Sequence, residues 1–145
     1  MKSKIAVASD HAGFEYKEFI KAHLISKDYE VCDFGTHSIE SVDYIDFVRP
    51  ASLSVAQGQN EFGIILGGSG NEAIVANRIP GIRCAVVWNE RTACLSKEHG
   101  DCNMIALGQR MMSKEEAISY IDLWLSSEFK GGRHQRRIDR IDEKY

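Results

Sequence analysis

Glycine-rich turns, carboxylates, histidines and arginines are the residues in this sequence that could do chemistry. The run Gly67-Gly68-Ser69-Gly70-Asn71 follows an apolar stretch, and Glu72 comes directly after it. Amide groups in such a turn can point inward and bind an anion, because glycine puts no Cβ in the way. The run lacks the Lys-Ser/Thr ending of a P-loop and the dinucleotide spacing, which disfavours nucleotide binding. It predicts either a phosphate or oxyanion nest or a turn that only permits tight packing.

Two carboxylates accompany this turn. Glu72 stands at the start of a predicted helix, where a carboxylate either complements the helix dipole or acts in catalysis. The pair Asp10-His11 follows the first apolar run of the chain. Such a pair is often an N-cap with a surface histidine, but here it faces the same sheet edge as the glycine run. Both interpretations stay open for each carboxylate at this stage.

A histidine and a basic tail lie later in the chain. His99 ends a helical stretch just before the fifth apolar run, which places it at the opposite edge of the sheet within its own subunit. If it acts, it reaches the site of a neighbouring subunit. Residues 130–140 hold five lysines or arginines and one histidine, and Arg133, Arg137 and Arg140 share a helical face. The tail is therefore a solvated helix, a nucleic-acid arm or, as we favour, a binder of a small phosphorylated ligand.

The elements that position these residues alternate between strand length and helix length. This alternation predicts an α/β fold with a buried parallel sheet, and ligands bind outside the carboxyl ends of such strands. The predicted strands are Lys4–Ser9, Glu30–Phe34, Phe62–Leu66, Arg83–Val87 and Asn103–Leu107. Helices are expected around Tyr16–Leu24, 46–57, 72–78, 90–98 and Ala117–Leu125, with Pro50 interrupting or restarting the second.

Composition limits the classes of protein that remain. The 145 residues fit a single domain spanning 1–145, and 43% hydrophobic with 27% charged residues is a globular balance. A net charge of -3 argues against a general nucleic-acid binder. No apolar run reaches membrane length and no secretion signal is seen, so we expect a cytoplasmic protein. The four cysteines have no zinc-like spacing with the five histidines, so we expect no metal.

Several short segments together resemble the ribose-5-phosphate isomerase B and galactose-6-phosphate isomerase family, nearly from end to end. They are Ala8-Ser9-Asp10-His11-Ala12-Gly13, Asp33-Phe34-Gly35-Thr36, Asp43-Tyr44, Gly67-Gly68-Ser69-Gly70, Ala76-Asn77-Arg78, Glu98-His99, Ala106-Leu107-Gly108-Gln109-Arg110 and Gly131-Gly132-Arg133-His134-Gln135. The resemblance implies a three-layer αβα Rossmann-like fold with a five-stranded parallel sheet and a C-terminal basic helix. It also implies a homodimer or dimer of dimers, without cofactor or metal, whose active sites are shared between subunits. The tail 129–145 is then expected to pack on the partner subunit.

The resemblance also implies roles for individual residues. His99 is similar to the group that opens the furanose ring, with Asp10 as its polar partner. Ser69 and the amides of the glycine loop, among them Gly68, Gly70 and Asn71, resemble an oxyanion hole for the cis-enediolate. Many family members have a cysteine at the position of Gly67, whereas another branch has glycine there and a glutamate a few residues later. Glu72 is thus the expected base. The expected phosphate clamp consists of His11, Arg110, Arg133, His134 and Arg137.

Three departures from the family pattern bear on activity. The glutamate branch usually has Gly-Ser-Gly-Asn-Gly-Glu, so the loop before Glu72 is one residue short here. Gly100 replaces the usual asparagine of the substrate site, and Ile45 replaces a usual proline. The expected reaction is interconversion of D-ribose 5-phosphate and D-ribulose 5-phosphate, a step of the pentose phosphate pathway. The alternatives are a six-carbon sugar phosphate such as galactose or allose 6-phosphate, or a weakly catalytic homologue that only binds sugar phosphate.

Overall fold

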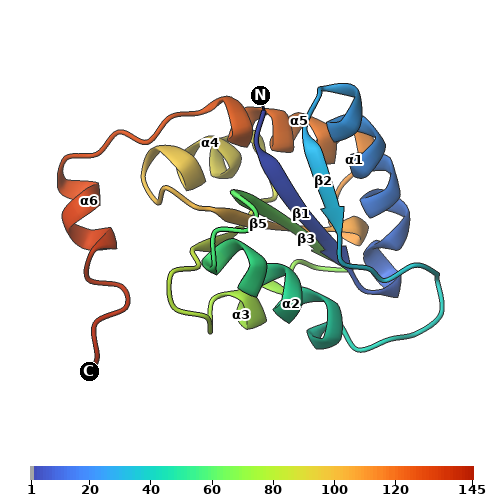
Figure 1. Cartoon of the computed structure of the whole chain (residues 1–145). Helices are drawn as coiled ribbons and strands as arrows, with labels where there is room; N and C mark the ends of the chain where they lie inside the picture. The colour runs from blue at the N-terminus through green and yellow to red at the C-terminus, as the bar shows by residue number, and fades with distance from the viewer. Residues whose placement is uncertain (1) are drawn as a thin grey trace.

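Five parallel strands form one sheet in the order β2-β1-β3-β5-β4 in the computed structural model, which describes residues 2–145 (Figure 1). The strands are β1 (Lys4–Ser9), β2 (Glu30–Asp33), β3 (Phe62–Gly67), β4 (Cys84–Val86) and β5 (Met104–Gly108). Each lies within one residue of its predicted bounds, and the predicted parallel α/β sheet is confirmed. The chain reverses its direction across the sheet between β1 and β3, since β2 and β3 pair with opposite sides of β1. A doubly wound sheet binds ligands at such a switch point.

Helices cover both faces of the sheet, which makes the fold three-layered (Figure 1). They are α1 (Phe14–Ser26), α2 (Ile45–Ala56), α3 (Ala73–Ala76), α4 (Glu90–Glu98), α5 (Lys114–Ser126) and α6 (Arg133–Ile138), with short 3-10 turns η1 (His11–Gly13) and η2 (Gln109–Met111). Successive strand residues point to opposite faces. Val7 and Leu66 therefore pack in one core with Trp124 of α5, whereas Ala8 and Ile65 pack in the other with Val48 of α2.

Two helix predictions need correction. Pro50 lies inside α2 and does not interrupt it, because Val48, Ala51 and Val55 keep a continuous buried face against the sheet. The helix predicted at 72–78 is only the four-residue α3. Asn77 leaves that helix to hold the next strand, accepting from the amide of Cys84 and donating to its carbonyl, each at 2.8 Å.

A buried lysine ties α1 to the end of β2. Lys17 has no exposed surface, and its ammonium donates to both carboxylate oxygens of Asp33 at 2.8 and 2.7 Å. Asp33 also accepts from Lys21 and from the amide of Gly35, each at 2.8 Å. The carbonyl of Gly35 in turn accepts from the amide of Ser9 at 2.7 Å. The ion pair thereby fixes the loop after β2 against the end of β1.

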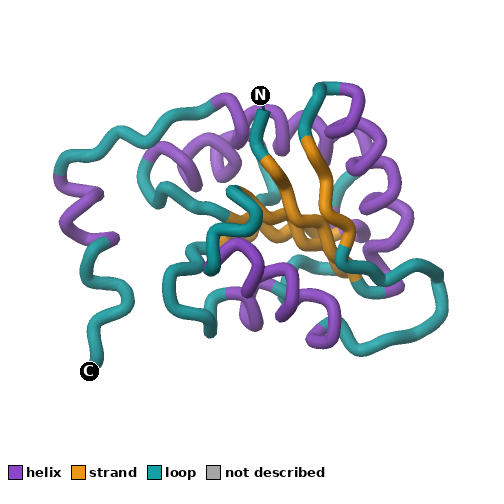
Figure 2. The backbone as a smooth tube through the Cα atoms, in the orientation of Figure 1, coloured by secondary structure: helices purple, strands orange, loops and turns teal. Residues whose placement is uncertain are grey.

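The C-terminal arm stands apart from the sheet. Figure 2 shows an extended segment leading from α5 to α6, which lies beside the layered body. None of the residues in α6 is buried. The arm touches the rest of the chain where Lys130 pairs with Glu98 at 2.8 Å and where Asp142 accepts from the amide of Gly81 at 2.8 Å. Within residues 2–145, no helix combines the length and the apolar character needed to cross a membrane.

Candidate active site

A pocket of about 350 Å³ opens at the carboxyl ends of β1 and β3, where the sheet reverses its winding. Seven of the residues singled out from the sequence lie in or beside it. Its lining consists of Asp10, His11, Ala12, Tyr44, Gly68, Ser69, Asn71, Glu72, Arg110 and Met111. The fold therefore brings the Asp10-His11 pair, the glycine loop and Arg110 together, as the parallel sheet predicts.

Glu72 supplies a buried carboxylate to this pocket. The residue is 4% exposed, and its Oε1 has no hydrogen-bond partner among residues 2–145. Its side chain does not cap α3, although the backbone of Glu72 is helical. Burial, helped by the charge of Asp10, raises the pKa of Glu72 above 4.5, and the amides of Glu72 and Gly70 only partly oppose this. A carboxylate with a raised pKa is suited to general acid-base chemistry near neutral pH.

The missing side chain of Gly67 gives this carboxylate its place. A Cβ on Gly67 would overlap the carboxylate of Glu72, whose atoms fill the space a side chain there would need. A side chain at position 67 and the observed placement of the Glu72 carboxylate therefore exclude each other. The loop that is one residue short still brings a carboxylate into the pocket.

The glycine loop leaves amide donors free. Among residues 2–145, the amides of Gly68, Ser69 and Asn71 donate to no protein acceptor. Gly70 has a φ of +90°, a conformation that glycine adopts without strain. A Cβ on Gly108 would lie 2.8 Å from the backbone of Ser69, so this glycine lets the loop cross the end of β5. The loop can hold an anion or a developing oxyanion.

Asp10 and His11 combine a structural and a ligand-facing role. The Oδ1 of Asp10 accepts from the amides of Ala12 and Gly13 at 2.9 and 3.1 Å, which makes Asp10 the N-cap of η1. The Nδ1 of His11 lies 3.1 Å from the amide nitrogen of Val42 and must accept its proton. A neutral His11 therefore carries its own proton on Nε2, where it can donate to a ligand.

Arg110 brings a cation to the same pocket. Its amide donates to the carbonyl of Gly68 at 3.0 Å, and its guanidinium lies over that glycine, where a Cβ would be 2.9 Å from Nη1. Within residues 2–145 the guanidinium forms no ion pair within 4.0 Å. An unpaired arginine beside a glycine nest is a fitting receptor for a phosphate monoester.

The other predicted residues form a second group. The rings of His99 and His134 stack with centroids 4.2 Å apart and an interplanar angle of 13°. Partial desolvation and the charges of His99, Arg133, Arg137 and Lys130 lower the pKa of His134 below 6.5. Arg133 and Arg137 project from α6 as exposed side chains. Gly100 follows His99 in the same turn.

The strand β5 separates the two groups. His99 comes five residues before its start, whereas Arg110 comes two residues after its end. At about 3.3 Å per residue, five residues of strand hold the two groups roughly 15 Å apart. Within one chain, therefore, His99, His134, Arg133 and Arg137 do not line the pocket that contains Glu72, as expected of His99 and of a tail that packs on the partner subunit.

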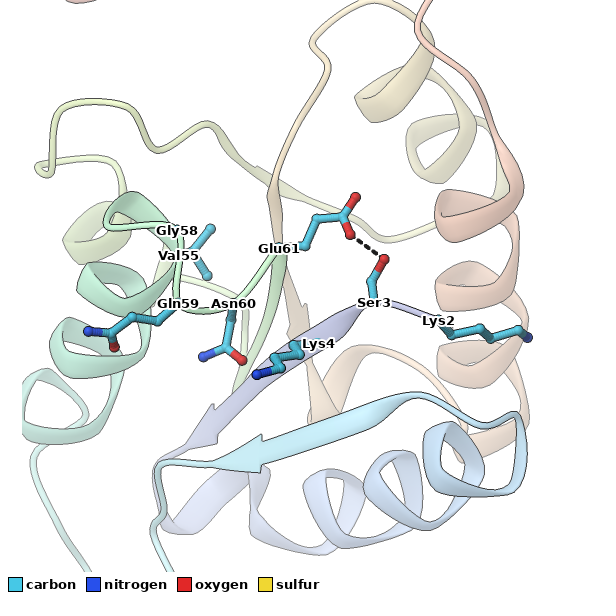
Figure 3. Close-up of a pocket in the computed structure, with 8 residues that line it drawn as sticks. All are labelled: Lys2, Ser3, Lys4, Val55, Gly58, Gln59, Asn60 and Glu61. Carbon is cyan, nitrogen blue, oxygen red and sulfur yellow. Dashed lines mark hydrogen bonds between the residues drawn. The ribbon is translucent and has the colours of Figure 1, made fainter.

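A larger cavity, about 520 Å³, lies at the opposite, amino edge of the sheet (Figure 3). It is lined by Lys2, Ser3, Lys4, Val55, Gly58, Gln59, Asn60 and Glu61, with the hydroxyl of Ser3 donating to the carboxylate of Glu61. None of the predicted site residues is among them. Size alone therefore does not identify the candidate site, and the chemistry of the lining favours the pocket around Glu72.

No three histidine, cysteine or acidic side chains within residues 2–145 gather closely enough to hold a metal ion. Sequence reasoning missed three lining residues, Ala12, Tyr44 and Met111, of which Ala12 belongs to the Ala8–Gly13 segment of the family resemblance. Tyr44 belongs to the Asp43-Tyr44 segment of the family resemblance, which was the available signal. Met111 follows Arg110 and is 66% exposed, and nothing in its sequence context marks it.

A doubly wound αβα fold of the Rossmann-like class, with a carboxylate, an anion nest and an arginine at its switch point, suits an enzyme that acts on a small phosphorylated substrate. Residues 5–141 match the family model described as Ribose/Galactose Isomerase. The chain belongs to that family.

Individual relatives agree with this assignment. The chain is 41% identical to ribose-5-phosphate isomerase B of Escherichia coli, with 95% of this chain and 93% of that protein covered. A crystal structure of a ribose 5-phosphate isomerase from Thermotoga maritima matches with a TM-score of 0.96 at 44% identity, covering 99% and 100% of the two chains. The Mycoplasma genitalium enzyme, solved with bound ribulose-5-phosphate, matches with a TM-score of 0.94 at 36% identity, covering 97% and 95%.

Proposed function

We propose that this chain is a ribose-5-phosphate isomerase that interconverts D-ribose 5-phosphate and D-ribulose 5-phosphate. The observation that carries the proposal is the buried carboxylate of Glu72, which lies beside free amide donors and an unpaired arginine. An aldose-ketose isomerase needs a base, a site for an oxyanion and a receptor for the phosphate. The full-length similarity to ribose-5-phosphate isomerases of about 40% identity supports the same reaction.

The chemistry assigned to Glu72 is a proton shuttle. Its carboxylate removes the proton on C2 of the opened aldose, and the electrons of that C–H bond form the enediolate. The amides of the glycine loop and Ser69 stabilise the negative charge that develops on O1. Protonated Glu72 then delivers the proton to C1, while the hydroxyl proton of O2 passes to O1. The substrate as a whole is neither oxidised nor reduced, so the reaction needs no redox cofactor.

A complete site requires a second copy of the chain in this proposal. His99 is assigned to opening the furanose ring, with Asp10 as its polar partner, yet His99 and Glu72 lie at opposite ends of β5. A homodimer in which the arm and α4 of one subunit face the pocket of the other would unite them. His134, Arg133 and Arg137 would then join His11 and Arg110 around the phosphate.

The proposal also covers the cellular location of the protein and the sugar phosphate that it converts. A cytoplasmic location is supported by four free cysteines, which suit a reducing compartment. A place in the pentose phosphate pathway follows from the substrate. The alternative substrate is a six-carbon sugar phosphate, supported by the family description, which names galactose as well as ribose.

The direct test compares wild type with Glu72→Gln, with ribose 5-phosphate and galactose 6-phosphate as substrates. We expect wild type to convert the pentose and Glu72→Gln to lose at least about a thousandfold in kcat. A phosphorylated hydroxamate that mimics the enediolate should still bind the variant, which separates lost chemistry from lost folding. Binding of the mimic by a wild type that converts neither sugar would instead identify a sugar-phosphate-binding homologue.

The shared site has a separate test. Glu72→Gln and His99→Asn subunits are purified, unfolded together and refolded as a mixture. A heterodimer of the two would have one intact site, so roughly a quarter of wild-type activity should return in an equal mixture with random pairing. Each variant refolded alone is the control. A mixture no more active than its components would place both residues in the same subunit's site or exclude one of them.

A further inference from the structure

The turn that follows His99 ends α4 in an unusual way. The helix finishes at Glu98, with His99 as its C-cap, and Asp101 has a φ of +42°. The amide of Asp101 donates to the carbonyl of Lys97 at 3.1 Å, the bond of a left-handed helix cap. Glycine or asparagine usually occupies that position, so an aspartate there needs support from elsewhere.

Arg83 provides that support. It stands one residue before β4, and its Nε donates to the carbonyl of Gly100 at 2.9 Å while its Nη2 donates to the carbonyl of Asp101 at 2.7 Å. Gly100 and Asp101 both lie past the end of α4, so their carbonyls take no part in the hydrogen bonds of the helix. The planar guanidinium binds two successive carbonyls, which a lysine cannot do with the same geometry.

The backbone of Arg83 is itself held in place by hydrogen bonds. The amide of Arg83 donates to Oδ1 of Asn103 at 3.0 Å, and Nδ2 of Asn103 donates to the carbonyl of Gly81 at 2.9 Å. The Arg83 side chain is only 23% exposed. The side chain of Asn103, just before β5, thus holds the backbone at Gly81 and at Arg83 in place.

A side chain at position 100 would be tightly packed. A Cβ on Gly100 would lie 3.0 Å from the Sγ of Cys102 and 3.0 Å from the carbonyl oxygen of Ser96. Its neighbours would have to move by a few tenths of an ångström, and the turn is held instead by the amide of Cys102, which donates to the carbonyl of Ser96 at 2.9 Å, and by a contact from outside. Arg83 is the side chain that supplies it.

We propose that Arg83 is a positioning residue for His99: by binding the carbonyls of Gly100 and Asp101 it sets the direction in which the imidazole leaves α4. This inference rests on the proposed function, in which His99 opens the sugar ring. Arg83 does not touch the substrate in this account. Its loss should therefore affect ring opening and leave proton transfer by Glu72 intact.

The substrates allow those two steps to be separated. Ribulose 5-phosphate has its carbonyl on C2 and a phosphate on its C5 oxygen, so it cannot close a furanose ring. Uptake of deuterium from D₂O at its C1 reports the Glu72 step alone. Conversion of ribose 5-phosphate, which is a furanose in solution, reports both steps.

The variants are Arg83→Met and Arg83→Lys, with His99→Asn as the reference and Arg49→Met as the matched control. Arg49 is exposed on α2 and forms no side-chain hydrogen bond or ion pair within the part of the chain that the structure describes. We expect Arg83→Met to lower kcat/KM for ribose 5-phosphate by about ten- to a hundredfold. Deuterium exchange into ribulose 5-phosphate should stay within about twofold of wild type, as in His99→Asn.

The remaining outcomes of the two assays also decide for or against the positioning role of Arg83. Equal losses in both assays, or no loss in either, would overturn the positioning role. Arg83→Lys should show the same selective loss with a smaller size, which keeps the test valid if Arg83→Met does not fold. A wild type inactive in both assays would overturn the proposed function, and the role of Arg83 with it, whereas a selective failure of the Arg83 prediction leaves the isomerase in place.

Discussion

The carboxylate of Glu72 lies over the α-carbon of Gly67, in the volume that a side chain at position 67 would occupy. This contact distinguishes the two roles that the sequence left open for Glu72. The side chain makes no cap hydrogen bond to α3 and instead contributes to the lining of the pocket. A loop shorter by one residue therefore still places a carboxylate beside the anion nest.

Gly67→Ala should displace Glu72. Because the new Cβ would overlap the carboxylate, we expect a loss of about 1 to 3 kcal/mol in the free energy of unfolding and a large loss of activity. Chemical denaturation and kcat measure the two effects. The double variant Gly67→Ala/Glu72→Ala should regain stability but not activity, and equal destabilisation in both variants would contradict the spatial coupling.

Glu72→Gln should stabilise the fold at neutral pH. The raised pKa of Glu72 means that the folded protein binds a proton more tightly than the unfolded chain, so stability falls as pH rises from 4.5 through the raised pKa. Removing the buried charge should recover about 1 to 3 kcal/mol at pH 7, with little difference below pH 4.5. Denaturation at several pH values tests this, with the exposed Glu128→Gln as a control that should not respond. A variant less stable than wild type at pH 7 would contradict the assignment of a burial penalty.

The raised pKa of Glu72 should also appear in the pH dependence of catalysis. A base acts only when ionised, so kcat/KM should fall in acid with a midpoint above 4.5, because burial raises the pKa of Glu72. The profile of wild type between pH 4 and 9 is the measurement. A midpoint at or below 4.5 would rule out a base with a raised pKa.

Asp33→Asn should destabilise the fold by about 1.5 to 3 kcal/mol, because the fully buried ammonium of Lys17 loses one of its two carboxylate partners and keeps only Glu18, at 2.8 Å. Burial acts to raise the pKa of Asp33, but hydrogen bonds from Lys17 and Lys21 outweigh it and hold the pKa below 3.8. The ionised pair therefore contributes stability above pH 3.8, and this is lost as pH falls through the lower folded pKa. Urea denaturation at pH 7 and pH 3 measures it. Glu30→Gln, which breaks an exposed pair at 3.9 Å, should change stability by less than about 1 kcal/mol.

The sheet was predictable because buried parallel strands are continuous apolar runs, and the bounds of β1 were correct at both ends. The helices were less predictable than the strands. Pro50 was expected to interrupt α2, but tertiary packing outweighs one missing hydrogen bond. Lysine is seldom fully buried, so nothing in the sequence indicated that Lys17 of α1 would be buried against Asp33.

Part of the site followed from topology. Asp10, Ser69 and Arg110 come after three strands that meet at one sheet edge, so their proximity was predictable from strand order alone. The contact between Glu72 and Gly67 was not, because it depends on the side-chain direction within a short loop. The stacking of His99 on His134 was also unexpected, since it joins α4 to an arm whose direction no pattern specifies. The family prediction is confirmed, and the individual residue roles stay predictions.

The arm that carries α6 leaves the body through Gly131 and Gly132, whose φ angles are +62° and +60°. No atom lies within 4 Å of where a Cβ would be on either glycine. A side chain there would meet no neighbouring atom, but both residues have a positive φ, and Gly132, with a ψ of -133°, has a backbone conformation that L residues rarely adopt. The two glycines are thus needed for the direction in which the arm leaves the body, although no neighbour restricts their space. A substitution at either glycine should therefore redirect the arm or strain it at its base, while the packed core of the domain stays untouched.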